Sequence, residues 1–161
     1  MKTLTLYHGS DAAPAEISRE ASAGFAKSGE ACFGWFSASR EYAEKYGEAG
    51  RYDVKVSGWI LNLRPITKGD PILPMREWQR ILSRFGVRLE IEAGFEDEEC
   101  KFWDMLDGHD RAFDAHCNLN EALLASGAGA IKAYEEYYRG AYLIQAPVLG
   151  LIRGRAVRRG A

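Results

Sequence analysis

The stretch LTLYHGS (residues 4–10) alternates leucine with threonine and then ends in a histidine followed directly by a glycine. Alternation of this kind is typical of a strand with one buried face, so a half-buried strand is predicted over Thr3–Tyr7. Glycine has no Cβ, which lets a ligand approach the backbone at Gly9, and the imidazole of His8 donates or accepts hydrogen bonds. The end of this first strand is therefore a candidate binding turn.

The length and composition indicate one globular domain over residues 1–161. The chain has 161 residues, 47% of them hydrophobic and 27% charged, with a formal net charge of -2. That length supports a substantial core and is crowded for two domains. No stretch approaches the ~20 apolar residues of a membrane span, and the N-terminus lacks the apolar segment of a signal peptide. We expect a cytoplasmic protein without a membrane partner.

The cysteines and the charge distribution argue against a disulfide-rich, metal-binding or general nucleic-acid-binding protein. Cys32, Cys100 and Cys117 are odd in number and lack the close spacing of metal ligands, so neither a disulfide framework nor a metal site is expected. The net charge argues against a general nucleic-acid binder. The segment RGRAVRR (153–159) differs from the rest of the chain because it concentrates four arginines. Such a run is usually a solvated terminus, but contact with phosphate, nucleic acid or an acidic partner stays open.

The order of the predicted elements favours a mixed α+β fold over an alternating parallel one. After the first strand, ACFGWF (31–36) and Tyr52–Leu63 are expected as strands. The short helix SASREYAEKYG (37–47) lies between them, with Ser37 or Ser39 as its N-cap. Extended structure returns over 130–134 and 141–152, with a turn between them.

The middle of the chain is predicted to be helical, with helices in 74–86, 97–108 and 110–127. The first of these carries an apolar stripe at helical spacing, which predicts core packing. Its members are Met75, Trp78, Ile81, Leu82 and Phe85. Phe102 and Trp103, in the second helix, are also expected in the core.

Three segments together resemble the ADP-ribosyltransferase fold family, in the branch defined by a His–Tyr–Glu triad. They are LYHGS (6–10), FGWFSASREYAEKYG (33–47) and LLASGAGAIKAYEEYYRGAYLIQAP (123–147). The resemblance implies an ADP-ribosyltransferase-like split β-sandwich, with the helical middle of the chain, 71–116, as an insertion. It also implies NAD as a co-substrate.

The resemblance assigns binding roles near the N-terminus. It places His8 on a ribose hydroxyl, the backbone of Gly9 on the nicotinamide amide, and Ser10 at a further hydrogen bond. Tyr46 matches the family's stacking tyrosine, and Tyr42 shares its side of the short helix because the two are four residues apart. A structural histidine and core tyrosines are the ordinary alternatives. The other expected NAD-binding residues are Trp35, Phe36 and Ser37.

The catalytic carboxylate is where the sequence departs from the family. Relatives carry a glutamate directly before the aromatic residue of the last strand, and Ala141 occupies that place here. Two glutamates lie upstream. The resemblance makes Glu136 the first choice for catalysis and Glu135 the second, with solvated hairpin residues as the alternative for both. Asp110 and Asp114 are more distant candidates for a second acidic role.

These residues predict an NAD-dependent ADP-ribosyltransferase that cleaves the nicotinamide glycosidic bond and transfers ADP-ribose to a macromolecular acceptor, by preference a protein. In size, motif order and acidic pair, the chain is similar to small phage ADP-ribosylating anti-CRISPR proteins, which implies a CRISPR effector as acceptor. A small acceptor or hydrolysis of NAD stays open within the same chemistry. The alternative, favoured by Ala141, is a non-catalytic module that binds NAD or nucleic acid and blocks a partner sterically.

Overall fold

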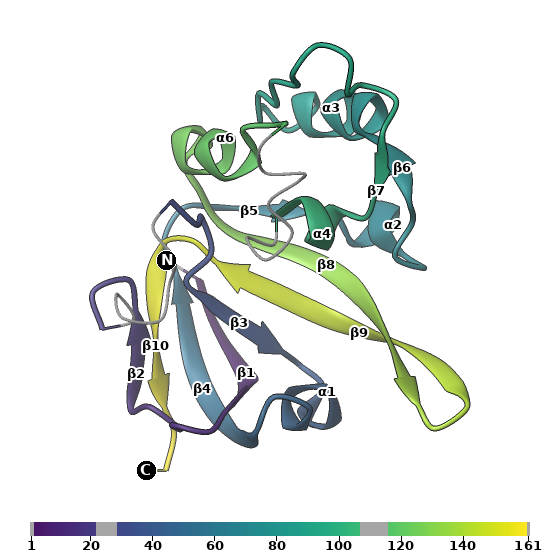
Figure 1. The fold of residues 1–161 in the computed structure, drawn as a ribbon. Helices are drawn as coiled ribbons and strands as arrows, with labels where there is room; N and C mark the ends of the chain where they lie inside the picture. Colours follow the sequence, from purple (N-terminus) through teal and green to yellow (C-terminus); the bar gives the residue numbers. More distant parts are fainter. Residues whose placement is uncertain (1, 22–28, 107–115, 161) are drawn as a thin grey trace.

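A large mixed sheet forms the centre of the computed structural model, which describes residues 2–21, 29–106 and 116–160 (Figure 1). Its eight strands follow the order β2-β10-β4-β1-β3-β9-β8-β5. Neighbouring strands are antiparallel except at one edge, where β5 pairs with β8 in parallel. The predicted α+β class is therefore confirmed.

The elements of the described chain have the following bounds. The strands of the large sheet are β1 (Lys2–Ser10), β2 (Glu16–Ser18), β3 (Gly34–Ser37), β4 (Glu48–Val56), β5 (Trp59–Asn62), β8 (Ala128–Arg139), β9 (Tyr142–Leu151) and β10 (Gly154–Arg158). A small second sheet pairs β6 (Leu73–Pro74) with β7 (Glu99–Cys100). The helices are α1 (Arg40–Glu44), α2 (Arg64–Thr67), α3 (Met75–Ser83), α4 (Phe102–Leu106) and α6 (Leu119–Ser126). Within these described ranges, no helix has the length and apolarity needed to cross a membrane.

The two halves of the large sheet meet at a single residue pair. On one side, β1 pairs with β4 along its whole length. On the other side, the register between β1 and β3 consists of Tyr7 opposite Ser37. The half-sheets β2-β10-β4-β1 and β3-β9-β8-β5 are therefore joined at one point, and His8 follows directly after that point along β1 (Figure 1).

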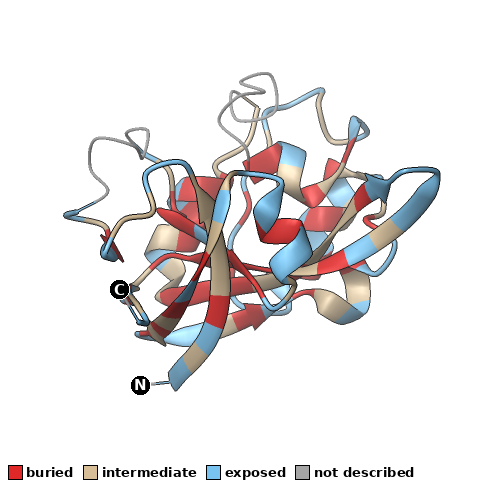
Figure 2. Cartoon of the chain, turned by 90° about the horizontal axis from the view of Figure 1, so that it is seen from below, coloured by how far each residue is buried: buried red, intermediate tan, exposed pale blue. Residues whose placement is uncertain are grey.

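Two large clusters of buried apolar residues form the core, and the first contains residues of both half-sheets. In the first, Tyr52, Val54 and Val56 are buried on one face of β4, as their alternation predicts. In the second, Trp78 of α3 and Leu123 of α6 pack in one cluster with residues of β5 and β8. Figure 2 shows the resulting alternation of buried and exposed residues along the strands. The helical middle of the chain thus covers one half of the sheet.

The helix predicted over 74–86 is confirmed as α3, and four members of its apolar stripe are buried: Met75, Trp78, Ile81 and Leu82. The fifth prediction is wrong, because Phe85 is 36% exposed. The helix ends at Ser83, so Phe85 lies beyond it and no longer follows the helical stripe. The helices predicted in 97–108 and 110–127 are present in shortened form as α4 and α6.

The strand predicted over Tyr52–Leu63 is two strands that belong to different half-sheets. β4 ends at Val56 and β5 begins at Trp59. Between them, Gly58 has a φ of +109°, a backbone conformation that favours glycine, and a Cβ there would lie 2.7 Å from the carbonyl oxygen of Gly127. The turn at Gly58 therefore carries the chain from one half-sheet to the other.

The basic C-terminal segment is a strand rather than a solvated tail. β10 lies between β2 and β4. The guanidinium of Arg153 donates hydrogen bonds to the carbonyl oxygens of Ala128, at 2.6 Å, and Leu124. Arg158 donates to the carbonyl of Ala13 at 3.1 Å. Much of the positive charge that could attract an external anion therefore binds the protein's own backbone.

The role of Arg153 is testable against a matched arginine in the neighbouring strand. We expect Arg153→Met to lower the free energy of unfolding by about 2 kcal/mol, because two backbone carbonyls lose a charged donor. Arg155→Met changes an exposed residue, so it should shift the free energy of unfolding by less than about 0.5 kcal/mol. Urea denaturation followed by circular dichroism measures both, and equal losses would contradict this account.

Candidate functional site

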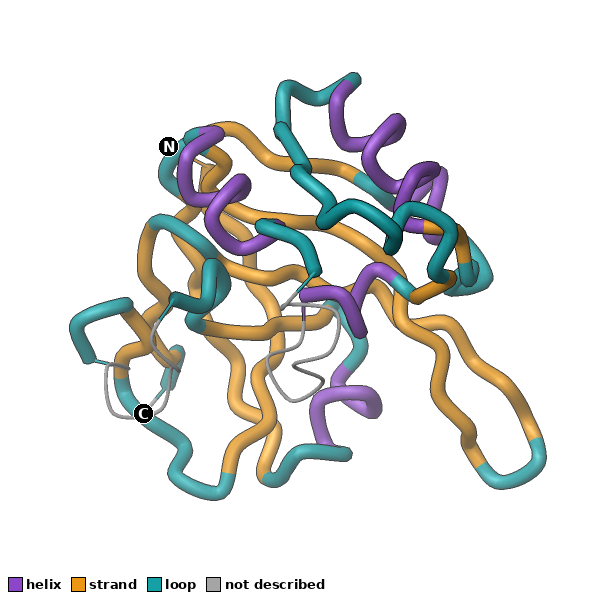
Figure 3. The backbone as a smooth tube through the Cα atoms, turned by 45° about the horizontal axis from the view of Figure 1, so that its top comes forward, coloured by secondary structure: helices purple, strands orange, loops and turns teal. Residues whose placement is uncertain are grey.

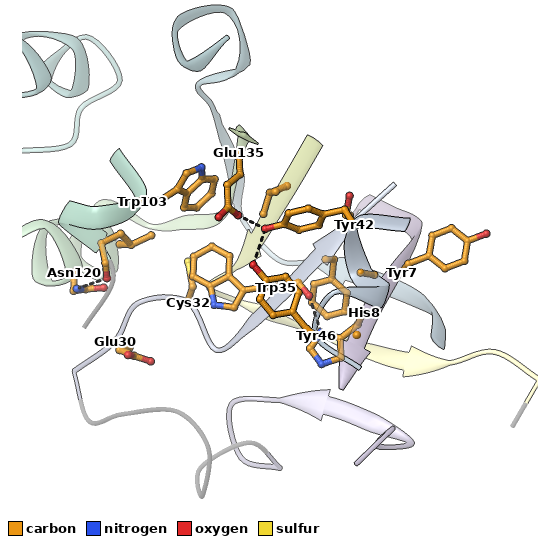
Figure 4. A pocket seen from close by; sticks show the side chains of 16 residues that line it. Tyr7, His8, Glu30, Cys32, Trp35, Tyr42, Tyr46, Trp103, Asn120 and Glu135 are labelled. Atoms are coloured by element: carbon orange, nitrogen blue, oxygen red, sulfur yellow. Dashed lines mark hydrogen bonds between the residues drawn. The ribbon is translucent and has the colours of Figure 1, made fainter. Parts of the chain in front are cut away.

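A cleft of about 430 Å³ opens beside the junction of the two half-sheets (Figure 4). Its walls come from β1, β3, α1, α4, α6, β8 and β9, so the three quoted segments meet here. The predicted binding and catalytic residues that line it are His8, Gly9, Trp35, Phe36, Ser37, Tyr42, Tyr46 and Glu135. Ser10 and Glu136 are outside its lining.

His8 bridges the junction between the half-sheets. Its Nδ1 lies 2.7 Å from the carbonyl oxygen of Trp35, and its ring packs on Phe36 and Tyr52 with centroid distances of 5.4 Å and 5.7 Å. Because a carbonyl only accepts, Nδ1 carries the proton, and Nε2 is the acceptor nitrogen of the neutral ring. Burial lowers the pKa of His8 below its ordinary 6.5, and the bond to Trp35 opposes that shift. The ring is therefore neutral at pH 7.

Gly9 has a structural reason to be glycine. A Cβ at this position would lie 1.7 Å from the carbonyl oxygen of Ala43 and 3.3 Å from the Cβ of Tyr46. α1 fills the side of Gly9 where a Cβ would stand, while Gly9 also lines the cleft. The missing side chain lets α1 pack directly on β1, and this contact fixes where the aromatic residues of α1 stand relative to His8.

The two predicted hydroxyl donors serve the local backbone. The Oγ of Ser10 accepts a hydrogen bond from the backbone amide of Ala12 at 3.2 Å. The Oγ of Ser37, which is buried, donates to the carbonyl of Pro147 at 2.6 Å and accepts from the amide of Ser39 at 3.0 Å. Ser39 in turn is the N-cap of α1. Ser37 thus ties β9 to the start of the helix.

Glu135 is held at the cleft wall by a tyrosine from α1. The hydroxyl of the buried Tyr42 donates to the Oε2 of Glu135 and lies 3.3 Å from the hydroxyl of Tyr46 (Figure 4). Burial raises the pKa of the Glu135 carboxyl, whereas the hydrogen bond from Tyr42 lowers it. Burial also raises the pKa of Tyr42, so its hydroxyl stays a donor at neutral pH. A carboxylate thus faces the cleft with a fixed orientation.

Glu136, the first choice from the sequence, lies on the other side of the hairpin. Successive side chains of a strand point to opposite faces, so Glu135 and Glu136 cannot share the cleft. The Oε1 of Glu136 and the Nε2 of Gln145 each lie 3.7 Å from the position that a Cβ on Gly69 would occupy. Ala141 lies at the turn between β8 and β9. Asp110 and Asp114 fall outside the described residues.

Several cleft residues had no predicted role in binding. Trp103 of α4, which we expected in the core, is half-buried and lines the cleft. Its Nε1 donates to the carbonyl of Tyr134 at 2.9 Å. Burial raises the pKa of the Cys32 thiol, which keeps it protonated. The apolar pattern of the sequence predicted burial for Trp103 and did not indicate that it lines a cleft. The remaining lining residues without a predicted role are Tyr7, Glu30, Ala43, Leu106, Asn120 and Val148.

The lining is aromatic and carries negative charge. Glu30 and Glu135 supply carboxylates, and the residues described as lining the cleft include no lysine or arginine. Lys45 lies near two tyrosine rings, with its Nζ 5.4 Å from the ring centroid of Tyr42 in α1 and 4.7 Å from that of Tyr137 in β8. Across the described ranges, no group of three His, Cys, Asp or Glu side chains could hold a metal ion. Such a cleft suits a flat ligand with cationic character.

The bond between Tyr42 and Glu135 can be tested by removing one oxygen atom. Tyr42→Phe deletes the donor that lowers the pKa of Glu135. We therefore expect that pKa to rise and the free energy of unfolding to fall by about 1–2 kcal/mol. Tyr46→Phe, in the turn that follows α1, is the matched control with a smaller change in both quantities. Titration of the side-chain carboxyl carbons by NMR measures the pKa, and equal shifts in the two variants would refute the assignment.

The neutral state of His8 is testable by a second titration. We expect the NMR midpoint of its imidazole to lie below 6.5, because burial disfavours the charged ring. His8→Asn identifies the signal by its loss. A midpoint at or above 6.5 would mean that the ring is solvated, or paired with an acid, and would contradict the geometry described here.

Comparison with known proteins gives no information about the chemistry of the cleft. No protein-family model matches the chain, and neither does a curated protein or a solved structure. The grouping of His8, Tyr42, Tyr46 and Glu135 in one cleft is therefore the observation from which a function has to be argued.

Proposed function

We propose that this protein is an NAD-dependent ADP-ribosyltransferase that binds NAD in the cleft beside the sheet junction. It breaks the bond between nicotinamide and ribose and passes ADP-ribose to a macromolecular acceptor. The supporting observation is that one cleft is lined by residues from three distant segments: His8, the pair Tyr42 and Tyr46 in and just after α1, and Glu135. The two half-sheets joined at one pair agree with the split β-sandwich that the sequence resemblance implies.

Glu135 is the proposed catalytic residue. Cleavage of a glycosidic bond passes through a transition state in which positive charge develops on the sugar. A carboxylate beside the ribose stabilises that charge more in the transition state than in the ground state, which raises the rate. The electron pair of the broken bond stays on the nicotinamide nitrogen. The acceptor's nucleophile bonds to the ribose carbon, and its proton passes to Glu135.

The other cleft residues are proposed to position the substrate. The Nε2 of neutral His8 accepts a hydrogen bond from a ribose hydroxyl, while its Nδ1 stays bound to the carbonyl of Trp35. The ring of Tyr46, which is 54% exposed, forms one aromatic wall. A volume of about 430 Å³ lies within the usual range for small-molecule sites.

A protein is the acceptor that the surface beside Glu135 suits best. The β8–β9 hairpin, which carries Glu135, extends beyond the rest of the sheet (Figure 3). Its outer part exposes Tyr138, Tyr142 and Leu143, at 73%, 76% and 52%. Apolar side chains grouped on an exposed element are a common feature of protein-binding surfaces. A CRISPR effector, which the sequence resemblance implies, is one acceptor of this class.

The two adjacent glutamates provide the test of this function. We expect Glu135→Gln to slow the release of nicotinamide from NAD at least about 100-fold, because one charge that stabilises the transition state is lost. NAD affinity should change little, since the substitution keeps the shape of the side chain. Glu136→Gln, on the opposite face, should stay within about threefold of the wild type. Chromatography measures nicotinamide, and calorimetry measures the affinity.

The outcome also separates the transferase from the second candidate function. Ala141, at the place where relatives carry glutamate, favours a module that binds NAD without cleaving it. Binding of NAD without release of nicotinamide, with and without a bacterial lysate, would establish that alternative. Loss of turnover in Glu136→Gln with full activity in Glu135→Gln would overturn the assignment of the catalytic residue.

A further inference from the structure

Trp35 is the exposed residue of β3. Gly34, Phe36 and Ser37 are buried, whereas Trp35 is 40% exposed and lines the cleft. Opposite Trp35 in the register with β9 stands Gly150. A Cβ on Gly150 would lie 2.7 Å from a ring carbon of Trp35, so the indole rests where a side chain on β9 would otherwise stand.

A second tryptophan braces this ring. The indole of Trp103 meets that of Trp35 edge to face, with centroids 5.2 Å apart and an interplanar angle of 79°. The Nε1 of Trp103 is itself fixed by the carbonyl of Tyr134. Figure 4 shows the indoles of Trp35 and Trp103 next to each other among the side chains that line the cleft. Packing against Gly150 and Trp103 restricts the rotamers of Trp35 before any ligand binds, which lowers the entropic cost of stacking on its ring.

A nearby positive charge distinguishes Tyr42 and Tyr46 from Trp35. The ammonium of Lys45 lies 5.4 Å from the ring centroid of Tyr42 and 5.8 Å from that of Tyr46. A cationic ligand ring on those faces would meet this like charge. The ring contact recorded for Trp35 is with Trp103, and in the described chain no cation lies over its indole.

We infer that Trp35 is the stacking platform for the positively charged nicotinamide ring, seated on Gly150 and braced by Trp103. This rests on the proposed function and adds a specificity determinant to it. Indole is the side chain that attracts a cation most strongly through its π face. With Glu135 in the same lining, the cleft distinguishes a pyridinium cation from a neutral ring of the same shape. It therefore prefers oxidised NAD to reduced NAD, whose nicotinamide ring is uncharged.

The chemistry of the step limits what Trp35 contributes. When the bond to ribose breaks, the electron pair stays on the ring nitrogen and nicotinamide becomes neutral. An attraction for the cation is then weaker in the transition state than in the bound substrate, so it supports binding and not the chemical step. Trp35→Leu should therefore raise KM about tenfold without lowering kcat.

The binding test uses a probe that the enzyme cannot cleave. The ring-methylated nicotinamide cation has the charge of the NAD ring without the ribose, and neutral nicotinamide is its control. Calorimetry should give at least about fivefold tighter binding of the cation to the wild type. Trp35→Leu should weaken that binding about tenfold and abolish the charge-transfer absorption of an indole stacked on a pyridinium. Trp59 is an exposed tryptophan on β5 outside the cleft lining, so Trp59→Leu should change neither the affinity for the cation nor the charge-transfer absorption.

The outcomes separate this inference from the proposed function. Equal affinity for the cation and for neutral nicotinamide, or no effect of Trp35→Leu on either probe, overturns the platform even if NAD is cleaved. No measurable binding of the cation overturns it as well. Selective binding that depends on Trp35, in a protein that never releases nicotinamide, supports the platform while the transferase fails. Urea denaturation of Trp35→Leu confirms that the variant is folded.

Discussion

The cleft depends on one constraint, the narrow junction between β1 and β3. A sheet whose central strands paired along their full length would leave no space between its halves, and here the register is a single pair, Tyr7 with Ser37. The hydrogen bond from His8 to the carbonyl of Trp35 spans the same junction. It aligns the end of one half-sheet with the start of the other, so the histidine is at once a structural brace and a wall of the site.

A second contact determines which acid faces the opening. α1 packs on β1 because Gly9 has no side chain, and the hydroxyl of Tyr42 thereby reaches Glu135 on β8. Residues far apart along the chain are thus linked through His8, α1 and the hairpin. The desolvated carboxylate and the aromatic walls follow from this packing. In the proposed reaction they would act together, the walls on the nicotinamide ring and the acid on the ribose.

Local patterns predicted much of the fold and part of the site. The alternation in LTLYHGS, the stripe of α3 and the cap at Ser39 each depend on neighbouring residues, and these elements are present. Which of Glu135 and Glu136 faces the cleft depends on the pairing of β8 with β9 and on where α1 packs, which no short pattern reports. The place of Trp103 in the wall and the pairing of β10 with β4 likewise depend on long-range contacts. The sequence therefore did not reveal that Arg153 and Arg158 bind the protein's own backbone carbonyls, whereas Arg155 is exposed.

The most direct test of the central claim is a map of backbone amide NMR shifts as NAD is added to the wild-type protein. We expect the affected amides to cluster at 7–9, 35–37, 42–46 and around Glu135, with little change in β2, β10 or the tip of the β8–β9 hairpin. Shifts confined to any other surface, or none at millimolar NAD, would show that these segments form a cleft without forming an NAD site.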